Sequence, residues 1–280
     1  MMNEAAIKDF WNTHPCGDQQ VGGLKDDYED FFNKYDAFRY KTESHILRCL
    51  DEVDFKDKRV LEIGLGEGAD SEQIIRRGGR WSGLDLTPES ISRLQTRMEI
   101  RGLDYDELKC GSILDAPYED NSFDIVFSHG VLHHVPDIHQ AQKEIARVLK
   151  PDGKLVIMMY AKMSLNYLLA ICVLRRLGLM FLYATGISLG KIYDEHYELA
   201  KEIGLLKYLK MDNFIHRNTD GPLNPYSKVY TAKEIEADFP LFEMERAHKE
   251  HMHAPPLSVN HLPGAGLMGW HLWAHMTPRK

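Results

Sequence analysis

The chain is 280 residues long, 44% of its residues are hydrophobic, and its formal charge at pH 7 is −8. This length suits one domain with an insertion or a cap, and the hydrophobic content is ample for a core. The acidic balance, without any basic run in the sequence, argues against a nucleic-acid partner. Four scattered cysteines without a C-x-x-C pair predict a reduced, cytoplasmic protein without structural zinc, and the acidic first segment predicts no signal peptide.

Residues 4–54 are expected to be mostly helical. Aromatic residues crowd into one short span of this region, and Phe31, Tyr35 and Phe38 recur at i, i+4 and i+7. Because this is the spacing of one helical face, we expect the stripe to pack its helix onto a sheet.

The next stretch is an apolar strand that runs into a glycine-rich turn. We expect the strand over Arg59–Ile63, alternate glycines from Gly64 to Gly68, and a helix over Asp70–Arg77. Glycine can take positive φ and lets backbone N–H groups come close to a ligand. The turn therefore predicts a nucleotide-like ligand.

A second strand, expected over Trp81–Leu86, contains Asp85, 21 residues after Gly64. A carboxylate at the carboxyl end of the neighbouring strand can accept hydrogen bonds from both hydroxyls of a ribose. The turn also satisfies the dinucleotide fingerprint with Ala69 in the third place, so a nicotinamide cofactor is an alternative. Glu62 argues against that alternative, because a dehydrogenase turn normally has an apolar residue there.

Strands and helices continue to alternate as far as residue 160. Thr87 is the expected N-cap of a helix with Pro88 at its first position and Ser90–Ile100 as its body. The other expected elements are strands at Glu107–Gly111, Phe123–Ser128 and Lys154–Tyr160, a helix at Gln140–Leu149 and a turn at Lys150–Gly153. The alternation predicts an α/β fold with a parallel sheet covered on both faces.

Residues 161–229 depart from this alternation. The apolar stretch Leu165–Tyr183 is interrupted by Arg175 and Arg176, which argues against a membrane-spanning helix. We expect a helical cap that closes over a substrate, with an interfacial helix facing a lipid surface as the alternative. Glu195–Lys210 is expected to form one amphipathic helix.

The C-terminal region begins with a capping-box pattern at Thr231, and strands are expected at Phe242–His253 and Leu267–Met276. His251 and His253 would lie on one face of the first of these strands. Histidines gather in this region, but no cysteine or acidic residue completes a recognisable ligand set, so we predict no metal. Lining a substrate pocket is the other interpretation of these histidines.

Four motifs follow one another in the order of a known family. They are Glu62 with the glycine turn, residues 120–126 (DNSFDIV), 128–137 (SHGVLHHVPD) and 144–157 (EIARVLKPDGKLVI). Together they resemble the class I S-adenosylmethionine (SAM) methyltransferases, most closely the ubiquinone and menaquinone biosynthesis-like branch. The resemblance implies a Rossmann-like, seven-stranded, mostly parallel sheet, its last strand antiparallel between the fifth and sixth, with a helical cap inserted after the fifth strand. It divides the chain into an N-terminal helical lid (1–54), a SAM-binding core (55–160), the cap (161–229) and a C-terminal helix with the last two strands (230–280).

The resemblance also implies a site for SAM and for its product S-adenosylhomocysteine. The residues expected to bind this cofactor are Glu62, Gly64, Gly66, Gly68, Asp85, Leu86, Ser112, Ile113, Ser128, Arg39 and Tyr40. An N-terminal helix often forms a lid in this family, so Tyr35, Arg39 or Tyr40 reaching over the cofactor is the alternative to packing on the sheet. In this interpretation Arg39 pairs with the methionyl carboxylate. Ser112 stands near the adenine, where many family members have an acidic residue, and backbone carbonyls around Ser128 hold the amino group.

Three histidines within six residues, His129, His133 and His134, follow the fourth expected strand. By resemblance His133 and His134 lie at the mouth of the methyl-transfer site, where a histidine can act as a general base near neutral pH. We therefore expect a methyltransferase acting on a small, hydrophobic or amphiphilic acceptor, with O-, N- and C-methylation all open. The alternatives are a catalytically silent SAM-binding protein and an NAD-dependent oxidoreductase. No nucleic-acid partner is expected, and the cap is a candidate for lipid contact.

Overall fold

The structure, a computed structural model, describes residues 4–22, 27–188 and 190–279, so residues 1–3, 23–26, 189 and 280 of the expected regions lie outside it. The strands are β1 (Arg59–Ile63), β2 (Arg80–Asp85), β3 (Glu107–Cys110), β4 (Phe123–His129), β5 (Leu149–Tyr160), β6 (Phe242–Glu250) and β7 (His271–Pro278). The α-helices are α1 (Glu4–Thr13), α2 (Asp18–Val21), α3 (Tyr28–Thr42), α4 (His45–Asp51), α5 (Ala69–Arg76), α6 (Pro88–Arg101), α7 (Ile138–Val148), α8 (Arg176–Thr185), α9 (Lys191–Ile203), α10 (Leu205–Tyr208), α11 (Met211–Arg217), α12 (Ala232–Asp238) and α13 (Ala265–Met268). Short 3₁₀ segments, η1 (Ile113–Asp115) and η2 (Leu132–His134), follow β3 and β4, and a π-helical segment, η3 (Asn166–Arg175), precedes α8.

The strands form one seven-stranded sheet in the order β3-β2-β1-β4-β5-β7-β6. Strands β1 to β5 pair in parallel, and β7 runs antiparallel between β5 and β6. This confirms the expected fold class. Ile63 of β1 pairs with Leu84 of β2, so the glycine turn and Asp85 leave the same edge of the sheet side by side.

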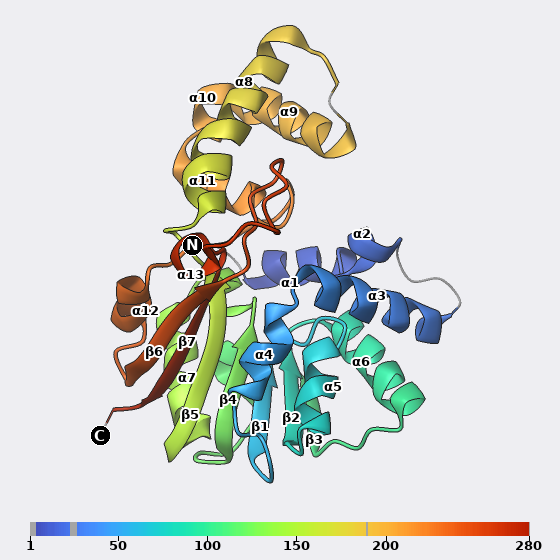
Figure 1. Cartoon of the computed structure of the whole chain (residues 1–280), viewed down its shortest axis with the longest axis vertical. Helices are drawn as coiled ribbons and strands as arrows, with labels where there is room; N and C mark the ends of the chain where they lie inside the picture. Colours follow the sequence, from blue (N-terminus) through green and yellow to red (C-terminus); the bar gives the residue numbers. More distant parts are fainter. Residues whose placement is uncertain (1–3, 23–26, 189, 280) are drawn as a thin grey trace.

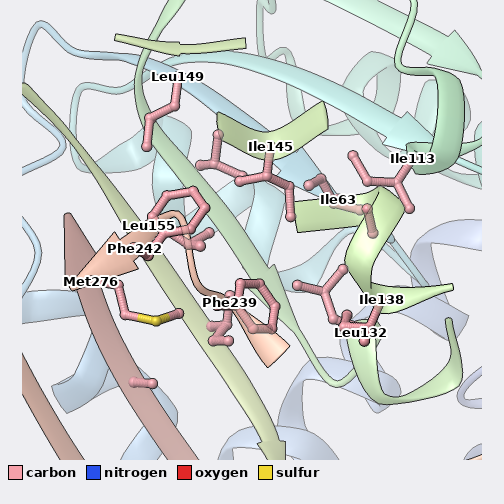
Figure 2. Packing of buried hydrophobic residues seen from close by; sticks show 14 of the residues in the cluster. Ile63, Ile113, Leu132, Ile138, Ile145, Leu149, Leu155, Phe239, Phe242 and Met276 are labelled. Atoms are coloured by element: carbon pink, nitrogen blue, oxygen red, sulfur yellow. The ribbon is translucent and has the colours of Figure 1, made fainter. Parts of the chain in front are cut away.

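Apolar clusters hold helices on both faces of the sheet. On one face Ile145 of α7 and Phe239, the residue after α12, join a cluster with the sheet residues Ile63 and Leu155 (Figure 2). On the other face α4, α5 and α6 pack around Trp81. Successive strand residues point to opposite faces, so neighbours along a strand belong to different clusters. Because both faces of the sheet are covered, these strands are apolar almost throughout.

Helix α3 packs on α6, whereas the sequence predicted that it packs on the sheet. The guanidinium carbons of Arg93 and Arg97 in α6 lie 5.7 and 5.1 Å from the ring centroids of Phe31 and Phe32. Phe38 is 41% exposed, so the predicted stripe is wrong at this position. The helix buries Phe32 instead, because the aromatic faces cover two arginines that are themselves buried.

Two strand boundaries differ from the prediction. Strand β5 starts at Leu149, which pairs with Phe123, and the next pair joins Ile125 to Lys154. The predicted turn is therefore a bulge of four residues within the strand. Strand β6 ends at Glu250, so His251 and His253 follow it and do not lie on a strand face.

The cap rises above the sheet at the edge near α1–α3, on the side opposite to the chain's C-terminus (Figure 1). It has an apolar cluster of its own, which includes Leu182, Tyr208 and Phe214. Gly204, with a φ of 89°, ends α9, so the helix predicted over Glu195–Lys210 is divided in two.

Segments η3 and α8 form one helix, Asn166–Thr185, which is long and apolar enough to cross a membrane by length and composition. Only 22% of its most apolar window is buried within the molecule. The helix continues through Arg175 and Arg176, and both side chains turn toward other segments of the molecule. Arg175 donates to the carbonyl oxygens of Pro255 and Asn218, and Arg176 donates to that of Leu209.

Candidate active site

The glycine turn between β1 and α5 has the backbone conformation that its sequence predicts. Gly64, Gly66 and Gly68 have φ values of 77°, 51° and 74°. A Cβ on Gly64 would lie 2.2 Å from Val131, and one on Gly68 would lie 2.3 Å from Leu94. Side chains are therefore excluded here by both backbone conformation and space.

The turn borders an open cavity whose empty volume is about 1100 Å³. Of the residues expected to bind the cofactor, those that line it are Glu62, Gly64, Gly66, Asp85, Leu86, Ile113 and Arg39. Of the expected catalytic residues, His129 and His134 line it. The carboxyl edge of the sheet thus brings together residues that are up to 95 positions apart in the chain.

Asp85 stands at the end of β2 and organises this edge. Its Oδ2 accepts from the backbone N–H of Leu65 at 2.8 Å, and its Oδ1 accepts from the N–H and Oγ1 of Thr87 at 2.8 and 2.7 Å. Burial raises the pKa of Asp85 although these donors favour the charged form. A carboxylate held in this way faces the cavity from a fixed position.

Arg39, Asp70 and His129 form a charged group on the cavity wall. Arg39 Nη2 is 2.7 Å from Asp70 Oδ2, and His129 Nδ1 is 2.6 Å from the same oxygen. Burial alone would raise the pKa of Asp70, but the adjacent Arg39 and His129 hold it below its ordinary value. Arg39 Nε and Asp70 Oδ1 are buried without a hydrogen-bond partner in the described part of the chain. One free donor and one free acceptor suit the carboxylate and the amino group of a methionyl moiety, so these residues fit SAM.

Glu62 lies in the cavity wall behind this group. Its Oε2 accepts from Trp81 Nε1 at 2.7 Å. Burial, together with the nearby Asp70, raises the pKa of Glu62 to about 8.

Four of the expected residues lie elsewhere than the cavity lining. Gly68 packs against α6, the hydroxyl of Tyr40 donates to the carbonyl of Ala69, and Ser128 Oγ donates to the carbonyl of Ile63. Ser112 Oγ donates to Glu4 Oε1 at 2.5 Å instead of facing an adenine. Its neighbour Ile113 lines the cavity in its place.

The N-terminal helices contribute cavity residues that sequence reasoning missed. Glu4, Ile7 and Trp11 of α1, Cys16 in the following turn and Tyr35 of α3 all line it. Only Tyr35 had a signal in the sequence, as part of the aromatic stripe. The side chains of α1 reach the cavity because this helix crosses the carboxyl edge of the sheet (Figure 1).

His133 does not lie at the mouth of the cavity, where the sequence prediction placed it. The residue is fully buried, and its ring centroid is 3.9 Å from that of Tyr160. Burial, together with the neighbouring His134 and His129, lowers the pKa of His133 well below its ordinary value.

His134 is placed differently and has an acidic neighbour. Its Nδ1 is 2.7 Å from the carbonyl oxygen of Tyr226, so Nδ1–H donates to that oxygen. Nε2 lies 3.4 Å from Asp220 Oδ2, and the hydroxyl of Tyr160 donates to Asp220 Oδ1 at 2.7 Å. Neither His134 Nε2 nor Asp220 Oδ2 has a hydrogen-bond partner among the described residues. The site therefore holds adjacent buried polar atoms without a hydrogen-bond partner in the described part of the chain. Both ring nitrogens of the neighbouring His133 also lack one among the described residues.

A second cavity, with an empty volume of about 1330 Å³, lies between the N-terminal helices and the cap. It shares Trp11 and Cys16 with the first cavity, and Asp220 is one of its lining residues. His134 lines the first cavity and Asp220 lines the second, so this pair of side chains lies where the two cavities meet.

Comparison with known proteins gives the family. Residues 61–157 match the family model described as a methyltransferase domain. A fatty-acid O-methyltransferase of Mycolicibacterium smegmatis is 32% identical over 126 residues, which are 44% of this chain and 43% of that protein. A ubiquinone biosynthesis O-methyltransferase of Idiomarina loihiensis is 36% identical over 100 residues, 35% of this chain and 40% of that protein. The chain spans about half the length of the curated relatives it matches.

Among solved structures, a SAM-dependent methyltransferase of Thermotoga maritima, described as a possible histamine N-methyltransferase, has a TM-score of 0.56 to this chain. The two are 17% identical, and the alignment covers 90% of this chain and 98% of the other, so the likeness concerns the fold. The fold, the glycine turn and the matched residues 61–157 are those of a class I SAM-dependent methyltransferase domain, as the motifs predicted.

Proposed function

We propose that the chain transfers the methyl group of SAM to a small amphiphilic acceptor bound in the second cavity. The observation that carries this proposal is a pair of buried atoms without a hydrogen-bond partner among the described residues. They are His134 Nε2 and Asp220 Oδ2, at the junction of the two cavities. An acceptor molecule with a hydroxyl or amino group there would donate to one of them.

The residues of the first cavity would hold the cofactor. Asp85 would accept from the ribose hydroxyls, and Arg39 with Asp70 would hold the methionyl end. SAM supplies a methyl group already activated by its sulfonium. The work left to the protein is to align the acceptor, exclude water and remove a proton, and alignment alone can contribute about 7–11 kcal/mol in favourable cases.

Proton removal falls to His134 in this proposal. Because Nδ1–H donates to the Tyr226 carbonyl, the lone pair on Nε2 is directed away from it, toward Asp220. Asp220 would stabilise the imidazolium that forms, and Tyr160 holds Asp220 in place. His133 is a supporting residue here, because its ring is buried against Tyr160.

The second cavity favours an acceptor with an apolar body and an anionic group. Its wall includes Phe10, Leu179 and Leu182, together with Arg175 and Arg217. In the described part of the chain neither arginine contacts a carboxylate, and both donate to backbone carbonyls. Burial lowers the pKa of Arg175 to about 10. A carboxylate or phosphate on the acceptor would supply the missing counter-charge.

The exposed face of the cap supports a lipid surface as the source of such an acceptor. Along η3 and α8, Val173, Leu177, Met180 and Phe181 are each more than 40% exposed. Residues 161–229 contain nine Lys and Arg against six Asp and Glu, although the whole chain is acidic. We therefore propose that the cap rests on an anionic membrane without crossing it. All four cysteines are free, as the cytoplasmic location that we propose requires.

Calorimetric titration with S-adenosylhomocysteine tests the cofactor part of the proposal. We expect Asp85→Ala to weaken binding about 10–100-fold, because the loss of a charged hydrogen-bond acceptor costs about 1.5–3 kcal/mol. Asp85→Asn, which keeps one of the two acceptor oxygens, replaces it if the alanine variant fails to fold. The exposed Asp115→Ala is the control. Failure of the wild-type chain to bind, or binding of NADH in its place, would sink the proposal.

Methyl transfer from labelled SAM to fatty acids, fatty alkyl phosphates and quinols tests the acceptor part. We expect turnover of an anionic amphiphile, and a loss of at least about 100-fold in kcat for Asp220→Asn with unchanged S-adenosylhomocysteine affinity. Asp212→Asn, an exposed change in α11, should leave both values unchanged. Tight cofactor binding without transfer to any acceptor would favour the catalytically silent alternative.

A further inference from the structure

A group of buried histidines lies outside both cavities, where the end of α3 meets strands β6 and β7. His45, His251 and His271 have ring centroids 4.8 to 5.4 Å apart. Glu43, directly after α3, is the acidic residue beside them. We propose that Glu43, His251 and His271 bind one divalent transition-metal ion of the Zn²⁺ type.

The donor atoms stand at the spacing of a metal site. One atom each from Glu43, His251 and His271 lies within 4.8 Å of the other two, and His271 Nε2 is 3.7 Å from Glu43 Oε1. Ligands of a tetrahedral zinc at about 2.1 Å are themselves about 3.4 Å apart, so a small adjustment closes the site. Two histidines and one carboxylate leave a fourth position for water.

His45 provides a hydrogen bond that orients one of the proposed ligands, His271. Its Nε2 is 3.0 Å from His271 Nδ1, which fixes the orientation of the His271 ring and leaves Nε2 directed toward Glu43. Metal-bound histidines almost always have a partner of this kind on the other ring nitrogen.

The backbone of His251 gives an independent indication. Its φ of 63° lies in the left-handed region, which residues with a side chain adopt rarely. The conformation is held by the N–H of Trp270, which donates to the His251 carbonyl at 2.8 Å. Such conformations persist mainly where the side chain's position serves a function. Here it directs the imidazole back toward Glu43 and His271.

The other groupings of histidine with acidic residues are less suited to this role. His133, His134 and Asp220 belong to the proposed acceptor site. Cys49 and His248 come together with Glu250, but this carboxylate pairs with Arg48 at 2.8 Å, closer than the 3.4 Å between Glu43 Oε2 and Arg39. Burial also raises the pKa of the Cys49 thiol to about 12.

An ion at Glu43 would join three segments that the chain keeps far apart. Glu43 follows the lid helix α3, His251 follows β6, and His271 begins β7. The loop between β6 and β7 rises from the sheet edge at this place (Figure 1). The role of the ion would therefore be to fasten the N-terminal lid to the antiparallel edge of the sheet.

The test uses the full chain, without a histidine tag and stripped of metal by a chelator. We expect Zn²⁺ to bind with a stoichiometry of one by calorimetry and to raise Tm, and Co²⁺ to give visible d–d absorption. Glu43→Gln and His251→Asn should each weaken Zn²⁺ binding at least about tenfold, and asparagine tolerates the left-handed backbone of His251. The exposed His261→Gln, in the same loop, is the matched control.

Circular dichroism of the metal-free variants separates misfolding from the loss of a ligand, and either folded variant is sufficient for the test. Absence of Zn²⁺ binding by the wild-type chain would overturn the proposal. Equal Zn²⁺ affinity in wild type, Glu43→Gln and His251→Asn would also overturn it, because the ion would then bind elsewhere. Neither result depends on methyl transfer, so the proposed function stands or falls separately.

Discussion

At the scale of single residues, position along the sheet edge decides which side chains reach the ligand. Asp85 and Glu62 were predicted correctly to adjoin the glycine turn, because a strand's end and the alternation of its side chains place them. The burial of His133 was not predicted, because it comes from Tyr160, which is 27 residues away in the chain. The contact of Ser112 with Glu4, 108 residues away, was not predicted either. Sequence spacing contains no information about such contacts.

The buried Glu62 predicts a pH dependence of stability. Its folded pKa of about 8 exceeds the ordinary value of 4.5, so the folded state binds a proton that the unfolded state has lost between these two values. The contribution of Glu62 to stability is therefore fully present below about pH 4.5 and is lost as the pH rises toward 8. The neighbouring Asp70 raises this pKa further, whereas Arg39 and the hydrogen bond from Trp81 lower it.

Glu62→Gln removes the charge and keeps an acceptor for Trp81 Nε1. We expect the variant to gain about 2–4 kcal/mol over wild type between pH 5 and pH 8, because each pKa unit corresponds to about 1.4 kcal/mol. Urea unfolding at several pH values measures this difference, with the exposed Glu99→Gln as a control. If the free energy of unfolding depended on pH in the same way for wild type and Glu62→Gln, the raised pKa of Glu62 would be contradicted.

At the scale of elements, local signals fixed the helix starts well and the packing partners poorly. Thr87 caps α6, with Pro88 at its first position, and Thr231 and Glu234 complete the predicted capping box of α12. These features depend on residues three apart. The predicted packing partner of α3, the sheet, was wrong. An aromatic stripe covers Arg93 and Arg97 of α6 as well as it would cover a sheet.

The helix formed by η3 and α8 allows a prediction about lipid binding. Leu177 and Phe181, one turn apart, are 58% and 55% exposed. We expect the double variant Leu177→Asp with Phe181→Asp to lose most of its binding to vesicles of mixed anionic and zwitterionic lipid, because charges cannot enter the acyl region at low cost.

Cosedimentation with vesicles measures the effect, and purely zwitterionic vesicles test the electrostatic contribution. The control is Leu241→Asp, a 44% exposed residue that precedes β6, at the end of the sheet away from the cap (Figure 1). Equal binding of wild type and the double variant to the anionic vesicles would show that this face does not contact lipid.

At the scale of the whole molecule, the two cavities take their residues from different parts of the fold. The first takes Asp85 and His129 from the ends of β2 and β4, Arg39 from α3 and Asp70 from α5. The second includes Asp220 and two arginines of residues 161–229, together with residues of the N-terminal segment. Trp11 and Cys16 belong to both cavities, so the N-terminal segment forms the boundary between cofactor and acceptor in the proposed reaction.

The sequence by itself determined the α/β alternation, the glycine turn, the position of Asp85 beside that turn and the family, because each depends on residues close together in the chain and on a strand period of two. The tertiary structure decided what depends on contacts between distant segments. It buried His133, paired His134 with Asp220, replaced Ser112 by Ile113 in the cavity wall, and brought Glu43 to His251 and His271. These positions follow from how the cap and the lid fold back over one edge of the sheet, which no local spacing specifies.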